Sequence, residues 1–328
     1  MSVVYNVDVL TTLIVTTKNE ALSLPHLLDS IAAQTRMPDE IVIVDGGSTD
    51  TTLEILQAFT QRLPLRIMSR PGANISQGRN MAIQAAAGEI ICSTDAGVRL
   101  DSCWLEKIAA PLEKGRADVV SGFFIPDPCS VFETALAATT LPTLQDIRPE
   151  RFLPSSRSIA FRKEAWAQVK GYPEWLDYCE DLIFDFALHA ANFRFEFVPQ
   201  AIVHFRPRSH LRAFFKQYYL YARGDGKANL WFKRHIIRYV TYLLALPLLI
   251  VLTFVFPLPA FALWIVAALV MFYTPYKRLL SMWRLLSLAD RLRALAWVPI
   301  VRVTGDLAKM LGYPVGVAWR MRRGAERV

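Results

Sequence analysis

Short apolar runs alternate with segments of helical spacing along the first part of the chain. The apolar runs predict four β-strands, at residues 11–17, 40–44, 65–69 and 89–94. Apolar positions three and four residues apart predict helices between them, at residues 22–34, 51–62 and 76–87. Strands that are apolar throughout are typical of a parallel sheet covered on both faces. The alternation therefore predicts an α/β fold with a mostly parallel, Rossmann-like sheet.

The pattern becomes less regular after residue 123. It predicts three further helices, at residues 131–141, at residues 163–169 and from Glu180 onward. It also predicts three more strands, at residues 158–161, 193–198 and 201–205. We interpret residues 1–230 as one domain.

A long uncharged stretch follows this domain. Residues 239–276 contain no charged side chain, and a helix needs about 20 residues to cross a bilayer. We therefore interpret residues 231–278 as a transmembrane helical hairpin that turns at Pro257 and Pro259. Two alternatives are a re-entrant hairpin and a buried hairpin in the core of a soluble protein.

The distribution of charge supports a membrane location. Residues 277–328 hold 11 basic and 3 acidic residues, so they carry the whole formal net charge of +8. Basic residues on both sides of the hairpin predict that both sides face the cytoplasm. We interpret residues 279–328 as a basic, amphipathic tail at the membrane interface rather than a nucleic-acid patch. The expected location is the inner membrane, with several crossings and with the domain of residues 1–230 in the cytoplasm. The four cysteines form no Cys-x-x-Cys pair, which indicates a reducing compartment.

Polar residues stand where three of the predicted strands end. Residues 17–20 follow the first strand, Asp45 the second and Asp95 the fourth. Ligands of open α/β sheets bind beyond the carboxyl ends of the strands. Asp45 can bind a base or ribose, and Asp95 can bind a ribose hydroxyl or a cation. The alternative is a pair of tight turns with aspartate caps.

Two further groups carry candidate chemistry. Arg79 lies near a helix start, where it can pair with a phosphate or with Asp95. Glu180, Asp181 and Asp185 crowd the first turns of a later helix. They can supply a general base for an acceptor hydroxyl, or they can stabilise the helix N-terminus.

Together these elements resemble the family 2 glycosyltransferases, which have the GT-A nucleotide-sugar-binding fold. The opening strand Ile14-Val15-Thr16-Thr17-Lys18-Asn19-Glu20 resembles the family's donor-contacting turn, and Asp45 matches its base-binding aspartate. Arg79-Asn80 matches the Arg-Asn pair near the donor, and Asp95-Ala96-Gly97 stands at the Asp-x-Asp position. Gly171-Tyr172-Pro173-Glu174 and the pair Glu180-Asp181 match the acceptor side. The resemblance implies donor contacts from Thr17, Asn19, Glu20, Asp45, Arg79, Asp95 and Ala96.

By the same resemblance, Asp181 is the catalytic base and Glu180 positions it or the acceptor. His204 matches a histidine that lies near the diphosphate in this fold, although a plain polar residue near a membrane is an equal alternative. The resemblance implies a divalent cation, Mg²⁺ or Mn²⁺, held by Asp95 and His204. Because Gly97 replaces the second aspartate, we expect this cation to be weakly held. Arg99 or Arg223 are alternative sources of positive charge, toward a phosphate or a lipid.

The Gln-x-x-Arg-Trp signature of processive synthases is absent from the sequence; residues 221–227 stand in its place. The expected reaction is therefore transfer of a single sugar, with inversion, from a nucleotide-sugar donor. The membrane segment favours a lipid or lipid-linked acceptor. The alternative function is a non-catalytic, nucleotide-binding membrane scaffold of a polysaccharide synthesis complex.

Overall fold

The computed structural model describes residues 9–325, and the chain in it forms two compact units. The sheet unit comprises the residues up to Ile125 together with Asp146–Phe205. The helical unit comprises Pro126–Gln145 and the residues from Arg206 onward. Each unit is described by itself.

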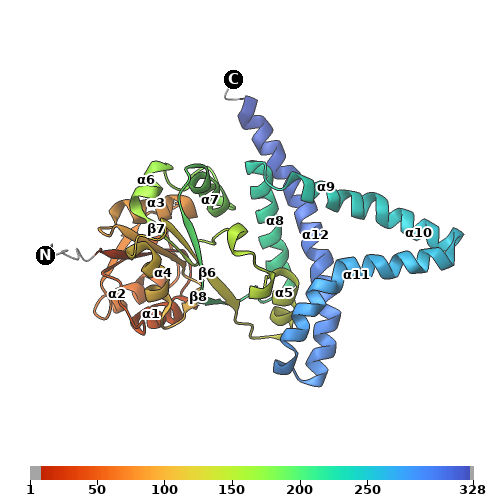
Figure 1. Ribbon diagram of the computed structural model, residues 1–328, viewed down its shortest axis with the longest axis horizontal. Coiled ribbons are helices and arrows are strands. Elements are labelled where there is room, and N and C mark those ends of the chain that lie inside the picture. The colour runs from red at the N-terminus through yellow and green to blue at the C-terminus, as the bar shows by residue number, and fades with distance from the viewer. Residues whose placement is uncertain (1–8, 326–328) are drawn as a thin grey trace. The chain divides into compact units, whose positions relative to one another are not determined.

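The sheet unit is built on one eight-stranded sheet (Figure 1) with the order β3-β2-β1-β4-β7-β6-β8-β5. The strands are β1 (Thr11–Thr17), β2 (Glu40–Asp45), β3 (Leu65–Ser69), β4 (Ile90–Asp95), β5 (Val98–Leu100), β6 (Val119–Pro126), β7 (Ile159–Arg162) and β8 (Phe195–Phe205). Strands β1 to β4 pair in parallel, whereas β7 is antiparallel to β4 and β6, and β5 is antiparallel to β8.

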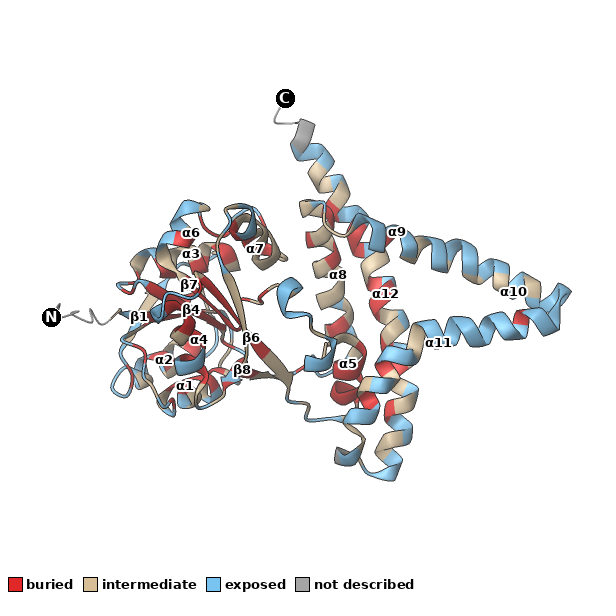
Figure 2. Cartoon of the chain, viewed as in Figure 1, coloured by how far each residue is buried: buried red, intermediate tan, exposed pale blue. Residues whose placement is uncertain are grey.

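Helices cover both faces of this sheet. They are α1 (Leu24–Ala32), α2 (Thr52–Phe59), α3 (Ile75–Ala85), α4 (Trp104–Glu113), α6 (Lys163–Gln168) and α7 (Glu180–Ala190). Leu13 and Val15 of β1 belong to one buried cluster, with α1 and α4, and Ile14 belongs to a second, with α3 and α7. Successive side chains of a strand point to opposite faces, so an all-apolar strand serves two cores. Figure 2 shows these strands buried.

The predicted strands and helices of residues 11–94 are all confirmed, with ends shifted by a few residues. The prediction of two strands at 193–198 and 201–205 is wrong, because they form the single strand β8. Helix α4 and strands β5 and β6 were not predicted. The doubly wound parallel pattern ends at β4. The directions of β6, β7 and β8 are set by long connections, which local periodicity does not report.

The helical unit contains α5 (Val131–Thr140), α8 (Leu211–Ala228), α9 (Phe232–Val240), α10 (Leu246–Val255), α11 (Pro257–Ser281) and α12 (Leu288–Ala325). A π-helical turn, Thr241–Ala245, joins α9 to α10. The unit begins earlier than the domain boundary expected at residue 230, since it includes α5 and α8. Most of the residues expected as a tail form α12, one continuous helix.

Helices α8 and α12 pack backbone against backbone. A Cβ atom at Gly312 would collide with the carbonyl oxygen of Tyr219, and one at Gly316 would collide with that of Arg223. A Cβ at Gly226 would likewise collide with the carbonyl oxygen of Tyr313. Glycine at these three positions therefore permits the close approach of the two helices.

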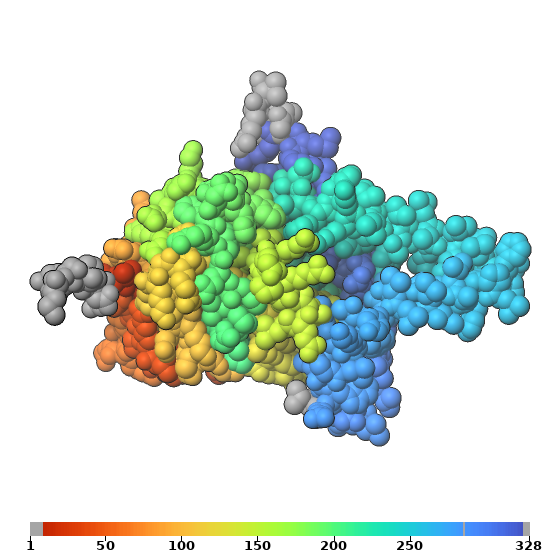
Figure 3. Space-filling view, in the orientation of Figure 1, coloured from red at the N-terminus to blue at the C-terminus, as the bar shows by residue number. Residues whose placement is uncertain are grey.

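Two helical segments of this unit are long and apolar enough, by length and composition, to cross a membrane. They are Phe232–Val255 and Pro257–Ser281, and almost none of their most apolar stretches is buried. Large apolar side chains such as Phe254, Leu258 and Val270 are more than 80% exposed. Figure 2 shows α10 and the first part of α11 projecting away from α8 and α12, whereas the end of α11 packs on α12. The same projection of α10 and the first part of α11 is visible in Figure 3. This exposure differs from that of a buried core hairpin.

Candidate active site

The sheet brings three of the predicted strand ends to one edge. Strand β1 lies between β2 and β4, with Thr17 beside Asp45 and Thr16 beside Asp95. The residues that follow β1, β2 and β4 therefore share the carboxyl edge of the parallel strands. This is the edge at which ligands of open α/β sheets bind.

Asp45 is fully buried, and its carboxylate organises the turn after β2. It accepts hydrogen bonds from the backbone N–H groups of Gly47 and Ser48, both at 2.9 Å, and from the Ser48 hydroxyl. Asn19, which has a left-handed backbone, ties the turn after β1 to the same loop: its side-chain oxygen accepts the N–H of Thr49 at 2.8 Å. Asp45 therefore shapes the predicted donor-binding loop.

Two other predicted donor contacts lie beside this turn. The hydroxyl oxygen of Thr17 is buried and, among the described residues, has no hydrogen-bond partner. The carboxylate of Glu20 accepts a hydrogen bond from the Ser23 hydroxyl. A Cβ atom at Gly97 would lie 4.0 Å from this carboxylate. Glu20 thus faces the position where the resemblance leads us to expect a second aspartate.

Arg79 of α3 links the predicted donor side to the predicted acceptor side. Its side chain is 3% exposed, and its two terminal nitrogens donate to Glu180 Oε1 at 2.6 Å and to Asp95 Oδ1 at 3.0 Å. Burial opposes its charge, but the carboxylates of Glu180 and Asp95 outweigh this effect and raise the pKa of Arg79. The sequence left two partners open for Arg79, a phosphate or Asp95. The structure shows the contact with Asp95.

The carboxyl groups at the start of α7 have perturbed pKa values. Burial raises the pKa of Glu180 to about 7, the charge of Asp181 adds to this rise, and Arg79 opposes it. Burial also raises the pKa of Asp181, against the opposing charges of Arg79 and Arg157. Asp185 is 1% exposed, and neither of its carboxyl oxygens has a hydrogen-bond partner among the described residues. Burial raises its pKa well above the usual value.

Asn80 and Asn74 fix the loop that leads to these acids. The Asn80 side chain accepts the N–H of Tyr172 and donates to its carbonyl oxygen, both at 2.8 Å. Asn74 caps α3 and donates to the carbonyl oxygen of Glu174 at 2.7 Å. The Gly-Tyr-Pro-Glu turn is therefore bound to α3, and α3 orients the start of α7.

Sequence reasoning missed Arg157 and the role of Tyr172. The Arg157 guanidinium lies 3.8 Å from Asp95 Oδ2 and 4.5 Å from the centre of the Phe205 ring. The ring of Tyr172 stacks on Phe184 and lies 5.4 Å from the Arg79 guanidinium. Arg157 directly precedes the Ser158–Phe161 run that was predicted as a strand. Its position directly before a predicted strand was the only signal that the sequence offered.

The remaining predicted residues are distributed as follows. Ala96 is buried after β4, and His204 on β8 lies opposite the exposed Arg99 on β5. Arg223 belongs to α8 of the helical unit. Within residues 9–325, no group of three or more His, Cys, Asp or Glu side chains is placed to hold a metal ion. The pairing of Asp95 with His204 as metal ligands therefore stays a prediction.

Comparison with known proteins assigns the class. The family profile "Glycosyl transferase family 2" matches residues 12–170. The chain is 22% identical over 220 residues to the O-antigen chain rhamnosyltransferase RfbN of Salmonella typhimurium, covering 62% of this chain and 70% of that protein. It is 26% identical over 223 residues to the succinoglycan biosynthesis protein ExoA of Rhizobium meliloti, covering 64% and 67%. The chain belongs to glycosyltransferase family 2 and is a nucleotide-sugar glycosyltransferase.

The fold agrees with this assignment. The mannosyltransferase PcManGT from Pyrobaculum calidifontis, solved in complex with GDP-Man and Mn²⁺, superposes with a TM-score of 0.54 at 19% identity. The superposition covers 94% of this chain and 86% of that one. The sheet unit therefore has the GT-A fold, and long C-terminal helices follow it.

Proposed function

We propose that the protein transfers a single sugar, with inversion, from a nucleotide-sugar donor to a lipid-linked acceptor at the cytoplasmic face of a membrane. The observation that carries the enzymatic part is the chain of contacts from Asp95 through Arg79 to Glu180, with Asp181 beside it. It joins the strand edge, where donors of this fold class bind, to a carboxyl pair whose raised pKa values suit a general base.

In the proposed reaction, the acceptor hydroxyl oxygen attacks the anomeric carbon. Asp181 takes the hydroxyl proton, and the bond from that carbon to the diphosphate breaks, so the nucleoside diphosphate leaves. Glu180, held by Arg79, keeps Asp181 in place. The loop that Asp45 organises holds the nucleoside, and Arg79 and Arg157 set the orientation of Asp95.

The residues at the strand edge fit a weakly held divalent cation. The Asp95 side chain is 34% exposed and offers one carboxylate, and Mg²⁺ commonly takes its other ligands from phosphate oxygens and water. His204 is the proposed second ligand. When bound, such a cation offsets the negative charge of the departing diphosphate. The Mn²⁺ in the structure of the Pyrobaculum mannosyltransferase supports this proposal.

A chelator titration tests the cation. We expect turnover to be lost in excess chelator and restored by Mg²⁺ or Mn²⁺, because one carboxylate holds the ion loosely. Full turnover in excess chelator, together with loss of activity in Arg99→Ala or Arg223→Ala, would contradict the metal proposal. It would favour arginine as the source of positive charge.

The membrane part of the proposal is supported by the exposed apolar surface of α10 and α11 and by the basic residues around it. The two bacterial relatives, named for O-antigen and succinoglycan synthesis, also favour a saccharide as acceptor. Neither high salt nor alkaline carbonate should strip the chain from membranes, because neither weakens the burial of apolar helices in lipid. A chain that washes off in salt would contradict a spanning hairpin.

One experiment tests the function as a whole. Release of nucleoside diphosphate is measured for a panel of nucleotide sugars, with and without extracted membrane lipid. We expect one donor to give release that rises when lipid is added. A non-catalytic scaffold, the alternative function, would bind a nucleotide but release no product under either condition.

A further inference from the structure

The helical unit contains a cavity that the sugar-transfer chemistry does not use. Its volume is about 380 Å³, within the range of roughly 300–1,000 Å³ found for ligand pockets. Residues of α5, α8, α11 and α12 line it, so all of its wall belongs to one compact unit. Three of its lining side chains are basic: Arg278 of α11 and Arg302 and Lys309 of α12. We call it the basic cavity.

Positive charge exceeds negative charge in the basic cavity. Among the described residues that line it, Asp306 is the only acidic one. Its carboxylate is shared: Arg238 donates to one oxygen at 2.7 Å, and Arg302 Nε lies 3.3 Å from the other. The Tyr242 hydroxyl also donates to Asp306, at 3.1 Å. One carboxylate therefore serves two guanidinium groups, and the charge of Lys309 is additional.

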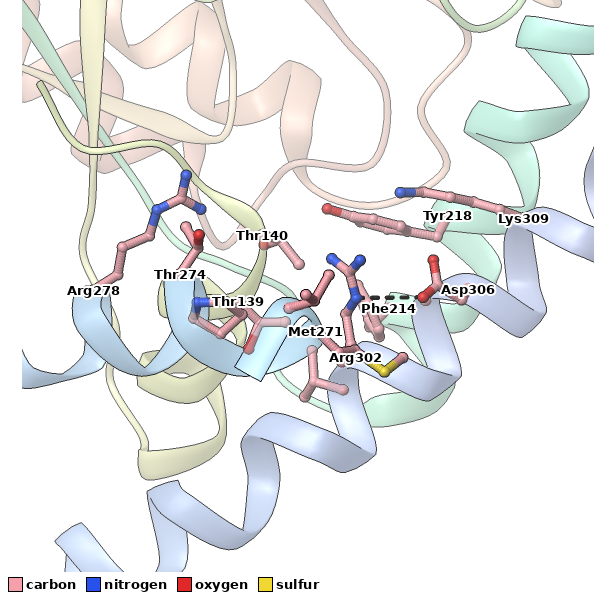
Figure 4. A pocket seen from close by; sticks show the side chains of 14 residues that line it. Thr139, Thr140, Phe214, Tyr218, Met271, Thr274, Arg278, Arg302, Asp306 and Lys309 are labelled. Carbon is pink, nitrogen blue, oxygen red and sulfur yellow. Dashed lines mark ion pairs between the residues drawn. The ribbon is translucent and has the colours of Figure 1, made fainter. Parts of the chain in front are cut away.

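The geometry gathers these cations around one space. Figure 4 shows Arg278 on one side of Thr140, with Arg302 and Lys309 on the other. The Lys309 ammonium lies 4.8 Å from the centre of the Tyr218 ring. Burial, together with the charges of Arg238 and Arg302, lowers the pKa of Lys309 to about 8. A bound anion would relieve this repulsion among the basic groups.

Two of the three lining threonines do not compete for this role as donors. The hydroxyl groups of Thr139 and Thr140 donate to the carbonyl oxygens of Ala135 and Leu136, both at 2.7 Å. Besides the hydroxyl groups of Thr274 and Tyr218, the donors that line the cavity are the basic side chains. Arginine and lysine together are the usual ligands of phosphate oxygens in proteins.

The surroundings of the basic cavity indicate where such a phosphate comes from. Val270 of α11 lines the cavity and is 82% exposed, so the wall continues into the exposed apolar surface of that helix. Arg278 lies two residues after the end of the uncharged stretch, at Tyr276. In a helix that enters a bilayer, such a position is at the level of the lipid headgroups.

We propose that the basic cavity binds the phosphate headgroup of a membrane amphiphile whose hydrocarbon chain lies along the exposed face of α11. Arg278, Arg302 and Lys309 hold the phosphate oxygens, and Val270 and the apolar residues before it contact the chain. This deepens the proposed function, on which it rests for the membrane location, because it gives the lipid partner a phosphate and a binding site.

Binding to the full chain in dodecyl maltoside micelles tests the proposal. The probes are geranylgeranyl phosphate, geranylgeraniol and inorganic phosphate, each measured by titration calorimetry. We expect geranylgeranyl phosphate to bind at least about tenfold more tightly than either of the others, because only it has both phosphate and chain. Equal binding of geranylgeraniol would overturn the phosphate site. Equal binding of inorganic phosphate would overturn the lipid source.

Variants locate the site. Lys309→Gln and Arg278→Gln should each weaken geranylgeranyl phosphate binding about tenfold or more, because each removes a charged donor. Lys277→Gln is the matched control, because it removes the same charge from the neighbouring residue, which does not line the cavity. Lys309→Arg keeps the charge and should keep most of the binding, which separates loss of a ligand contact from misfolding. An equal loss in Lys277→Gln would show diffuse attraction and overturn the basic cavity as the site.

The same preparations separate this proposal from the proposed function. Nucleotide release is measured on each variant alongside lipid-phosphate binding. Release that continues in a wild-type chain that binds no geranylgeranyl phosphate would overturn only the basic cavity. Binding without release from any donor would overturn the enzymatic proposal and leave the cavity in place.

Discussion

Two groups of acidic side chains in the sheet unit have opposite surroundings. Asp45 is buried, yet its carboxylate accepts two backbone N–H groups and a hydroxyl, so its charge is fully compensated. Glu180 and Asp185 at the start of α7 are buried with fewer partners, and Asp185 has none among the described residues. Burial raises the pKa values of Glu180, Asp181 and Asp185. A compensated carboxylate shapes a loop, whereas an undercompensated one is ready to exchange a proton.

The largest effect should come from removing the base. Asp181→Asn keeps the shape of the side chain but cannot take the acceptor proton, so sugar transfer should fall by roughly 10²–10⁴-fold with donor affinity nearly unchanged. Steady-state transfer rates and donor titration measure the two quantities. Asp185→Asn is the matched control one helical turn away, and it should cost far less, because the raised pKa already favours the neutral form of Asp185. Equal losses of the transfer rate in Asp181→Asn and Asp185→Asn would contradict the assignment of Asp181 alone as the base.

Asp45→Ala should affect the donor loop instead. It leaves the N–H groups of Gly47 and Ser48 without their acceptor, and we expect the free energy of unfolding to fall by about 1–3 kcal/mol. Donor affinity should weaken before the rate of transfer at saturating donor. Thermal unfolding and donor titration check both expectations. Asp50→Ala, in the same loop but exposed, should have the smaller effect on each. A variant that binds donor normally would show that the loop does not depend on Asp45.

The smallest effect concerns pH. The pKa of Glu180 is raised to about 7, so the coupled Glu180–Asp181 pair gains a proton as pH falls through this value, and kcat/KM should decline on the acid side. Glu180→Gln removes one of the two like charges, so the acid limb should move to lower pH. The raised pKa also means that Glu180 contributes stability below its ordinary pKa and that this contribution is lost as pH rises through about 7.

Initial rates and melting temperatures between about pH 5 and 9 measure both quantities. If the acid limb of Glu180→Gln coincided with that of the unchanged chain, Glu180 would have no part in the titration that controls transfer.

The sequence by itself determined those features that neighbouring residues impose on one another. The period of apolar positions identified the strands and helices of residues 11–94, and the absence of charge marked the two exposed apolar helices. These patterns survive in a single sequence because helix and strand periods are local. The order of motifs also placed Asp45, Asp95, Glu180 and Asp181 correctly at the ends of elements.

Only the tertiary structure decided which side chains meet. Arg79 contacts Asp95, 16 residues away, and Glu180, 101 residues away, and no local period reports such pairs. The basic cavity likewise takes its wall from four helices that are spread over residues 131–325 of the chain. Burial and partnership fix whether a carboxylate is compensated or reactive, and both depend on long-range packing. The sequence could therefore propose that Asp45 and Asp181 matter, but only packing shows that Asp45 has three hydrogen-bond donors and that Asp181 accepts the N–H of Leu182.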